Sequence, residues 1–447
     1  MKWSSEGRVE SSTMKFLNVR QTDDRTYQFT LTDSHVTYAN TLRRLMLTGV
    51  ETVAFRSDMT STGSTTDVIV RHNDTPMTNE MLADRIGLLP IHVTNPNEWN
   101  SKKYLFSLNV VGDKDEVRYV KSEDFVITDI SNVGPSEEDD EEKKVEVGKR
   151  VPTEMFFPRN PLTNDTCLIA TLQPGTDANQ QRIEIEAVAS KGTGREHARF
   201  SSVSQCSYEY SPDDNPQRIQ ELFLQWLTVT KKVNNPDKAS ERYAELQREF
   251  NTMQIKRCFK INEKGEPFSF DFTVETVGVL DVKYIVNRAC EVGENMCGKY
   301  VNLHEGDLPD EITLMPADAR VIGFDFLFRG HDHTLGNLLQ TWLVEHHIEG
   351  DAQPAITYAG YSVPHPLRDE MVLRIGVKDG KESTARAAVA AAARGCAGWF
   401  QQLRGEWNLG MGKPLGVAAS ASQGVRRPVR IAPKTSQAQQ AQQARVG

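Results

Sequence analysis

The hydrophobic pattern of residues 37–50, TYANTLRRLMLTGV, predicts one amphipathic helix. At 3.6 residues per turn, one side of this helix is apolar and consists of Tyr38, Ala39, Leu42, Leu45, Met46, Gly49 and Val50. The opposite side consists of Asn40, Thr41, Arg44 and Thr48, with Arg43 at the border. We expect the apolar side to pack against another element of the protein. The polar side is then available for a larger partner.

The pattern changes twice along the first two thirds of the chain. A second amphipathic helix is predicted at 76–91, and short alternating runs separated by Pro, Asn, Asp and Gly then dominate from residue 93 onward. Strand and helix patterns return at 268–297. The simplest organisation is one discontinuous domain, formed by residues 14–92 and 262–298. A β-rich domain, residues 93–261, is inserted in it.

A further unit follows at 319–405, where strand and helix patterns alternate again. Strands are predicted at 320–328, 355–361 and 371–377, and helices at 334–346 and 384–403. The remaining segments are predicted as a polar leader at 1–13 with Met14 as a second candidate start, a linker at 299–318, and a disordered tail at 406–447.

The sequence of the first predicted helix is repeated later in the chain. Residues 37–47 match residues 334–344, with Asn40 opposite Asn337 and Leu42 opposite Leu339, and strands flank both segments. Two similar units predict a pseudo-symmetric pair whose helices pack on each other. The fold class is therefore α+β. We predict that the interface between the two units contains Ala39, Leu42, Leu45, Met46, Leu335, Leu338, Leu339 and Trp342.

Composition narrows the class of protein. A chain of 447 residues with 38% hydrophobic content fits two or three folded domains. A formal net charge of −9 argues against a protein whose main task is to coat nucleic acid. No apolar run is long enough for a membrane span or a signal peptide. The six cysteines form no C-x-x-C pair, so we expect buried thiols in an intracellular, reducing compartment and no structural zinc.

Two charged segments and four histidines have alternative interpretations. The acidic run at 136–144 is a solvated loop or a docking segment for a basic partner, and the basic tail at 413–447 is solvated or makes weak phosphate contacts.

Four histidines are close in sequence and suggest a zinc site: His331, His333, His346 and His347. His333 and His346, however, would be about 18 Å apart along a helix, which disfavours a shared metal.

The first domain resembles the alpha-like subunits of multisubunit RNA polymerases. These are the bacterial alpha N-terminal domain, the archaeal D subunit and the eukaryotic third-largest subunit. Residues 37–55 resemble their N-x-L-R-R helix, and NEMLADRIGLLPI at 79–91 resembles their helix ending in R-x-G-L-x-P. ASKGTGREHARFSSV at 189–203 is similar to the K-G-x-G-x-x-H-A segment of their insert domain, and VETVGVLDV at 274–282 to the returning strand.

The last unit resembles the other half of that pair, the archaeal L subunit and its small eukaryotic counterpart. HDHTLGNLL at 331–339 and YAGYSVPHPL at 358–367 match the two motifs of that subunit, with Tyr358 in place of Phe. The resemblance covers most of residues 14–403. The cysteines that bind zinc or an iron–sulfur cluster in some D-type subunits are missing. A D-like and an L-like subunit fused in one chain resembles the arrangement in large nucleocytoplasmic DNA viruses.

The resemblance implies assembly rather than chemistry. It implies a non-catalytic subunit on which the second-largest and largest polymerase subunits dock, with a small zinc-binding subunit nearby and little direct contact with DNA or RNA. Asn40, Arg43, Arg44 and Arg85 are the predicted large-subunit interface, because arginines make forked bonds to partner carboxylates. On the pattern alone, solvated surface arginines are an equal interpretation.

No cofactor and no metal is expected in this chain, because the zinc and magnesium of the complex belong to other subunits. A viral protein of this kind would work in the host cytoplasm, in the nucleus or in the virion. Two other functions stay open at this point: a stand-alone interaction scaffold, and a metal-dependent hydrolase that uses the histidines.

Overall fold

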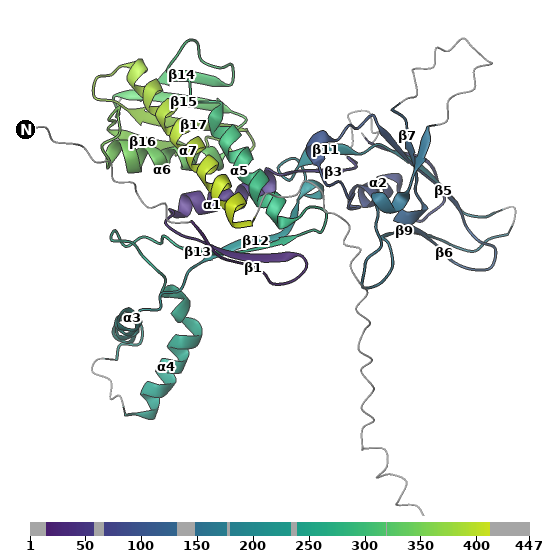
Figure 1. The fold of residues 1–447 in the computed structure, drawn as a ribbon, viewed down its shortest axis with the longest axis horizontal. Coiled ribbons are helices and arrows are strands. Elements are labelled where there is room, and N and C mark those ends of the chain that lie inside the picture. The colour runs from purple at the N-terminus through teal and green to yellow at the C-terminus, as the bar shows by residue number, and fades with distance from the viewer. Residues whose placement is uncertain are drawn as a thin grey trace, which may run out of the picture. The chain divides into compact units, whose positions relative to one another are not determined.

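The computed structural model describes residues 15–57, 67–131, 148–176, 179–233, 239–318 and 320–411 (Figure 1). The predicted leader, the acidic run and the basic tail lie outside the described residues. Helix α7 (Glu382–Met411) extends past the predicted end of the last domain at residue 405. In the part of the chain that the structure describes, no helix is both long enough and apolar enough to cross a membrane.

The first domain is built on a four-stranded antiparallel sheet in the order β1-β2-β13-β12. Its strands are β1 (Phe16–Gln21), β2 (Thr26–Leu31), β12 (Val203–Tyr210) and β13 (Phe270–Thr276). Alternate residues of β13 are buried, as the period of a strand with one solvated face requires. Helices α1 (Val36–Thr48) and α5 (Val282–Gly298) pack on the buried face.

The last domain repeats this plan. Its antiparallel sheet has the order β14-β15-β17-β16, and its helices are α6 (His333–Leu343), which continues as a π-helical turn (Val344–Ile348), and α7. The strands are β14 (Ile312–Pro316), β15 (Gly323–Arg329), β16 (Tyr358–Ser362) and β17 (Glu370–Gly376). Strand β14 corrects the prediction of a linker at 299–318, because this segment supplies an edge strand that pairs with β15.

The two domains share one hydrophobic core. Helix α1 contacts both α5 and α6, and α7 lies along α5, as Figure 1 shows. Gly293 of α5 faces Phe400 of α7 closely, since a Cβ built on this glycine would be 2.8 Å from the Phe400 ring. The helices of the two domains therefore pack directly on each other, and burial of apolar surface at about 25 cal/mol per Å² favours the pairing.

The inserted domain has a separate core of buried residues. Its main sheet has the order β4-β10-β5-β7-β8, and two strand pairs, β6-β9 and β3-β11, lie beside it. The elements are β3 (Glu51–Ala54), β4 (Val68–Asn73), α2 (Asn79–Gly87), β5 (Tyr104–Val111), β6 (Arg118–Lys121), β7 (Val126–Asp129), β8 (Lys149–Val151), β9 (Leu168–Leu172), β10 (Arg182–Ala187) and β11 (Ser190–Thr193). Short 3-10 turns occur at Pro96–Glu98, Ser122–Asp124, Thr153–Met155, Ala198–Phe200 and Ile255–Arg257.

These cores correct the predicted insert boundaries of 93–261. The core of the insert extends from Val53 to Ala189 and includes Leu82 and Ile86 of α2, because the apolar side of that helix packs there. Strand β12, predicted inside the insert, instead pairs with β13 in the first sheet.

A helical hairpin projects between β12 and β13. The helical pattern predicted at 217–254 forms two helices, α3 (Pro216–Val229) and α4 (Glu241–Met253). Aromatic rings hold them together: Phe223 lies 5.1 Å from Phe250 and 5.5 Å from Tyr243, measured between ring centroids. This small core is separate from the two larger ones, so the hairpin is a module of its own.

Candidate assembly interface

The predicted interface residues on the apolar side of α1 and on α6 lie in the shared core. Seven of the eight are buried, and Trp342 is partly buried against the same core. The seven are Ala39, Leu42, Leu45, Met46, Leu335, Leu338 and Leu339.

Arg44, on the polar side of α1, also faces α6, which corrects the prediction that this arginine stays available for a larger partner. The Thr341 hydroxyl lies 3.0 Å from that of Thr37, and both residues are buried. Arg44 donates from Nε to the Thr334 hydroxyl at 2.8 Å and from Nη2 to Asp332 at 3.2 Å. A helix wheel predicts a single buried face. Helix α1 contacts both α5 and α6, so more of its surface is in contact than the apolar side alone.

Tyr38 completes the contact between the helices. Its hydroxyl donates to Glu345 Oε2 at 2.7 Å, and its ring packs 5.0 Å from that of Trp399. Burial, together with the neighbouring Glu345 carboxylate, raises the pKa of Tyr38 far above its ordinary value. The phenol therefore stays protonated and acts as a fixed hydrogen-bond donor between the two domains.

Arg43 and Asn40 occupy a different environment, at a cleft. Both Nε and Nη2 of Arg43 donate to Asn40 Oδ1, at 3.0 and 2.9 Å. Among the described residues, no carboxylate is paired with this guanidinium. The two side chains line a cleft together with residues of β12 and the turn that follows α4. Their proposed role in binding a large subunit stays a prediction.

Arg85 lies in an exposed patch on α2. Its Nη2 donates to the backbone oxygen of Leu168 at 3.1 Å, which holds the guanidinium over β9. Met81 is 60% exposed and Leu88 66% exposed, and they occupy the positions four before and three after Arg85 on the same helix face. A cation surrounded by apolar side chains is the composition that protein interfaces favour.

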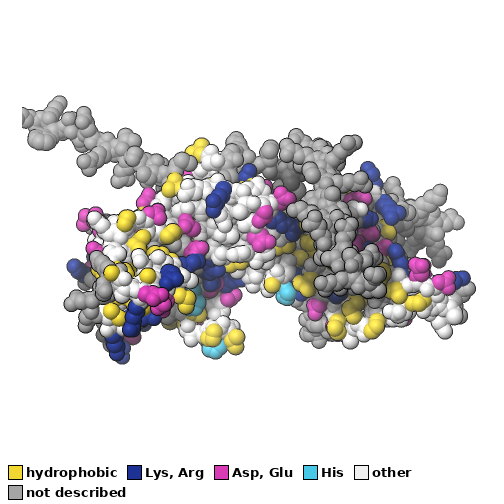
Figure 2. Space-filling model, turned by 90° about the horizontal axis from the view of Figure 1, so that it is seen from below, with side chains coloured by type: hydrophobic (Ala, Val, Ile, Leu, Met, Phe, Trp, Pro, Cys, Tyr) yellow, Lys and Arg dark blue, Asp and Glu magenta, His cyan; other side chains and the backbone are white. Residues whose placement is uncertain are grey.

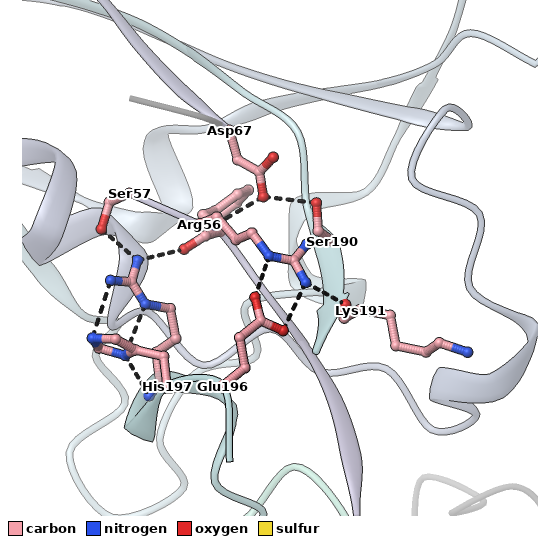
Figure 3. Close-up of polar contacts among 9 residues, drawn as sticks. Arg56, Ser57, Asp67, Ser190, Lys191, Glu196 and His197 are labelled. Atoms are coloured by element: carbon pink, nitrogen blue, oxygen red, sulfur yellow. Dashed lines mark hydrogen bonds and ion pairs between the residues drawn. The ribbon is translucent and has the colours of Figure 1, made fainter. Parts of the chain in front are cut away.

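A network of polar contacts connects the K-G-x-G-x-x-H-A segment to residues 55–57, which follow β3 (Figure 3). Arg56 makes a forked pair with Glu196 and also donates to the Lys191 carbonyl at 2.8 Å. These bonds lower the pKa of Glu196. Arg199, only 4% exposed, donates to His197 Nδ1 at 3.0 Å, to the Phe55 carbonyl at 3.0 Å and to Ser57.

This network also explains Gly87. A Cβ at that position would lie 2.5 Å from Arg199 Nη1 and 3.0 Å from the Phe55 carbonyl oxygen, so a larger residue there would displace the Arg199 guanidinium. The sequence motif identified this segment but did not single out Arg199, whose side chain is buried.

Arg195 of the same segment donates to Asp369 at 3.0 Å and to the Gly330 carbonyl at 3.1 Å, so the segment also contacts the last domain.

The candidate zinc histidines have other partners. The Tyr300 hydroxyl and His331 Nε2 lie 2.6 Å apart, His333 lies 3.3 Å from the Tyr361 hydroxyl, and His347 lies 3.0 Å from the Pro354 carbonyl oxygen. Within the described ranges, no group of three or more His, Cys, Asp or Glu side chains is arranged to hold a metal ion. Five of the six cysteines are buried, as predicted, whereas Cys167 is exposed, so the prediction of a buried thiol is wrong at this position.

Comparison with known proteins identifies the class. The RNA polymerase Rpb3/Rpb11 dimerisation domain matches residues 28–297, and a second model of the same description matches residues 324–406. The chain is 24% identical over 314 residues to the DNA-directed RNA polymerases I and III subunit RPAC1 of Bos taurus, covering 64% of this chain and 83% of the relative. It is also 24% identical to subunit Rpo3 of Methanosphaera stadtmanae, over 64% of this chain and 97% of that protein.

The chain therefore belongs to the Rpb3/Rpb11 dimerisation-domain family, and it has two such domains. It is an alpha-like, non-catalytic subunit of a DNA-directed RNA polymerase.

Proposed function

We propose that this chain is the assembly platform of its polymerase, with both members of the alpha-like pair fused in one polypeptide as an intramolecular heterodimer. The contact between α1 and α6 carries this proposal. Buried apolar residues of both helices share one core, and Arg44, Thr37 and Tyr38 bond to α6 or its cap. Covalent linkage makes the pairing intramolecular, at an effective concentration of roughly millimolar for a linker of modest length.

Two surfaces support docking of the large subunits. Asn40 and Arg43 line a cleft, and Arg85 lies between Met81 and Leu88 in an exposed apolar patch. The second-largest subunit and then the largest subunit dock on these surfaces, with a small zinc-binding subunit nearby. Because Arg44 is engaged with α6, we assign it to the internal interface rather than to a docking surface.

The remaining expectations belong to the same proposal. The zinc and magnesium of the complex are bound by other subunits, and this chain contacts DNA or RNA little. On the face shown in Figure 2, Lys and Arg side chains are interspersed with Asp and Glu, which favours protein partners over a phosphate backbone. The fusion of a D-like and an L-like unit supports an origin in a large nucleocytoplasmic DNA virus, with transcription in the host cytoplasm, the nucleus or the virion.

Co-purification tests the proposal. A tagged full-length chain, co-expressed with the two large subunits, should capture both of them. Arg43→Glu should reduce that capture about tenfold or more, because loss of a charged contact at an interface commonly costs more than 1.4 kcal/mol. Arg71→Glu is the matched control, since Arg71 is exposed on β4 and pairs with Glu186 of the neighbouring strand β10. If the wild-type chain captures neither large subunit, it is a stand-alone scaffold and the proposal fails.

A further inference from the structure

Strand β12 has a free edge in the described part of the first sheet. It is the last strand in the order β1-β2-β13-β12. The amide of Ser211 donates to the Ser269 carbonyl at 3.0 Å, and the two residues are in register with the β12–β13 pairing. Along an antiparallel ladder, hydrogen-bonded pairs alternate with non-hydrogen-bonded pairs, and the residues of the latter direct their N–H and C=O groups away from the partner strand. Counting back from Ser211, the residues Tyr210, Tyr208 and Cys206 belong to non-hydrogen-bonded pairs. The backbone groups of Cys206, Tyr208 and Tyr210 therefore point away from β13, toward the free edge.

A cleft follows this edge. The five consecutive residues Cys206–Tyr210 line one cavity of about 930 Å³. Because side chains on a strand alternate between its two faces, consecutive residues line a single cleft only if it runs along the strand's edge. Helix α1 contributes Asn40 and Arg43 to one wall, and the turn after α4 contributes Ile255 and Lys256 to the other.

The chain returning from the α3–α4 hairpin already uses this edge further along. Asp213 N donates to the Cys258 carbonyl at 3.0 Å, and Lys260 N donates to the Ser211 carbonyl at 3.0 Å. This pairing covers the chain that follows β12 and leaves β12 itself open. The base of the hairpin therefore closes one end of the cleft, and the edge beyond it has room for another strand.

The side chains of the cleft define what it would accept. Tyr208 and Tyr210 form an aromatic floor, with ring centroids 6.4 Å apart. Lys256 is already paired with Glu209 at 2.8 Å. In the described chain the Arg43 guanidinium donates to Asn40 alone, so it is the cation left to receive a carboxylate. A strand carrying one acidic and several apolar side chains complements this surface.

We propose that an extended segment of a large polymerase subunit pairs with the free edge of β12 as a fifth strand. Its backbone bonds to Tyr208 and its neighbours, an acidic side chain binds Arg43, and apolar side chains cover Tyr210 and Ile255. The inference rests on the proposed function for the identity of the partner. It adds the mode of binding and gives the hairpin a role as one wall of the docking site.

Two substitutions at one position isolate the backbone contact. Tyr208→Ala and Tyr208→Pro both remove the ring, but only proline removes the outward-facing N–H, and it leaves the bonds to β13 in place. Capture of the large subunits by the full-length chain should fall about threefold with alanine and about tenfold further with proline. Equal capture by the two variants overturns the added strand, whereas a wild-type chain that captures nothing overturns the proposed function.

Cross-linking tests the same site independently of how well the proline variant folds. The photoreactive residue p-benzoylphenylalanine replaces Tyr210 or Ile255 in the full-length chain, and the assembled complex is irradiated. Met253, which is 70% exposed but does not line the cleft, is the control position. Both cleft positions should cross-link to one short segment of a single large subunit, and the control should not. Cross-links only within this chain, or none from the cleft, overturn the inference even when the large subunits are captured.

Discussion

The Arg44 guanidinium lies 3.2 Å from the Asp332 carboxylate, so a helix of the first domain touches the N-terminal cap of a helix in the last. Asp332 also accepts from the Thr334 amide at 2.8 Å, which caps α6. Burial alone would raise the pKa of Asp332, but bonds from Thr334 and the charge of Arg44 hold the pKa below its ordinary value. This arginine therefore helps to align the two domains, together with the Tyr38–Glu345 and Thr37–Thr341 contacts.

Reversing the charge of Arg44 tests this alignment. Arg44→Glu places a carboxylate beside Asp332, so we expect the free energy of unfolding in urea to fall by about 1–2 kcal/mol. Adding Asp332→Asn should restore part of the loss, because asparagine keeps the capping oxygen of α6 and removes the repulsion between two carboxylates. Arg43→Glu is the control and should change stability by less than about 0.5 kcal/mol. Equal losses for Arg43→Glu and Arg44→Glu would contradict the different surroundings of these arginines.

Cleaving the chain between its domains tests the intramolecular pairing. Residues 304–307 are exposed and precede β14, so a protease site inserted there should be accessible. After cleavage we expect the two fragments to elute together in size-exclusion chromatography, because the shared core holds them without the linker. Dilution should separate them only at low concentration. Fragments that separate immediately after cleavage would show that the helix contacts are too weak to define a dimer.

Two glycines of one helix compare a packed and an open position. A Cβ on Gly293 of α5 meets the Phe400 ring at 2.8 Å, whereas a Cβ on Gly298 meets nothing within 4 Å. Gly293→Ala should lower the free energy of unfolding by about 1–3 kcal/mol, because the ring must move. Gly298→Ala should be neutral or stabilising, since alanine favours the helix. Thermal unfolding measures both, and a stabilised Gly293→Ala variant would contradict the close packing of α5 on α7.

Much of the secondary structure was predictable because its periodicity is strong. Strand β13 alternates buried and partly exposed residues along its whole length, and the leucines of α6 recur at helical spacing. Strand β14 was missed because it is short, begins three residues after Pro309 and ends at Pro316, and these prolines indicate a linker when taken alone. Its assignment depends on pairing with β15, a non-local interaction that no local pattern contains.

The candidate site was predictable in its residues but not in their surroundings. The N-x-L-R-R motif identified Arg43 and Arg44 together, yet one lines a cleft and the other bonds to Asp332, 288 residues away. Likewise, the hairpin pattern gave no indication that Ile255 would lie opposite α1. Both relationships arise from how distant segments meet in the fold, and a helix wheel assumes only one neighbour.

The pH dependence of stability should depend on an ion pair between α5 and β3. Arg288 donates to Glu51 through Nε at 2.9 Å and Nη2 at 2.7 Å. Burial opposes the charged carboxylate, but these bonds prevail and lower the pKa of Glu51 below its ordinary value of 4.5. A lowered pKa in the folded state adds stability above pH 4.5 that is lost as the pH falls through the folded-state value.

Urea unfolding of the wild-type chain and Glu51→Gln across pH measures this contribution. At pH 5 to 7 we expect the wild-type chain to be more stable than Glu51→Gln by about 2 kcal/mol. Below pH 4.5 this difference should shrink, because the wild-type carboxylate becomes neutral as the pH falls through its folded-state pKa. A difference that stays constant down to pH 3 would show that the ionised pair is not its source.

The exposed patch around Arg85 gives the last prediction. Leu88 is 66% exposed and contributes little to the core of the insert, so Leu88→Asp should change the free energy of unfolding by less than about 0.5 kcal/mol. If a large subunit covers the patch, the same substitution buries an unpaired carboxylate in the interface, and capture should fall about tenfold or more. Ile322→Asp is the matched control, since Ile322 is 71% exposed and lies in the last domain. Co-purification of the three proteins distinguishes the outcomes: equal capture by both variants would exclude this patch from the docking surface and leave the cleft at Arg43 as the candidate contact.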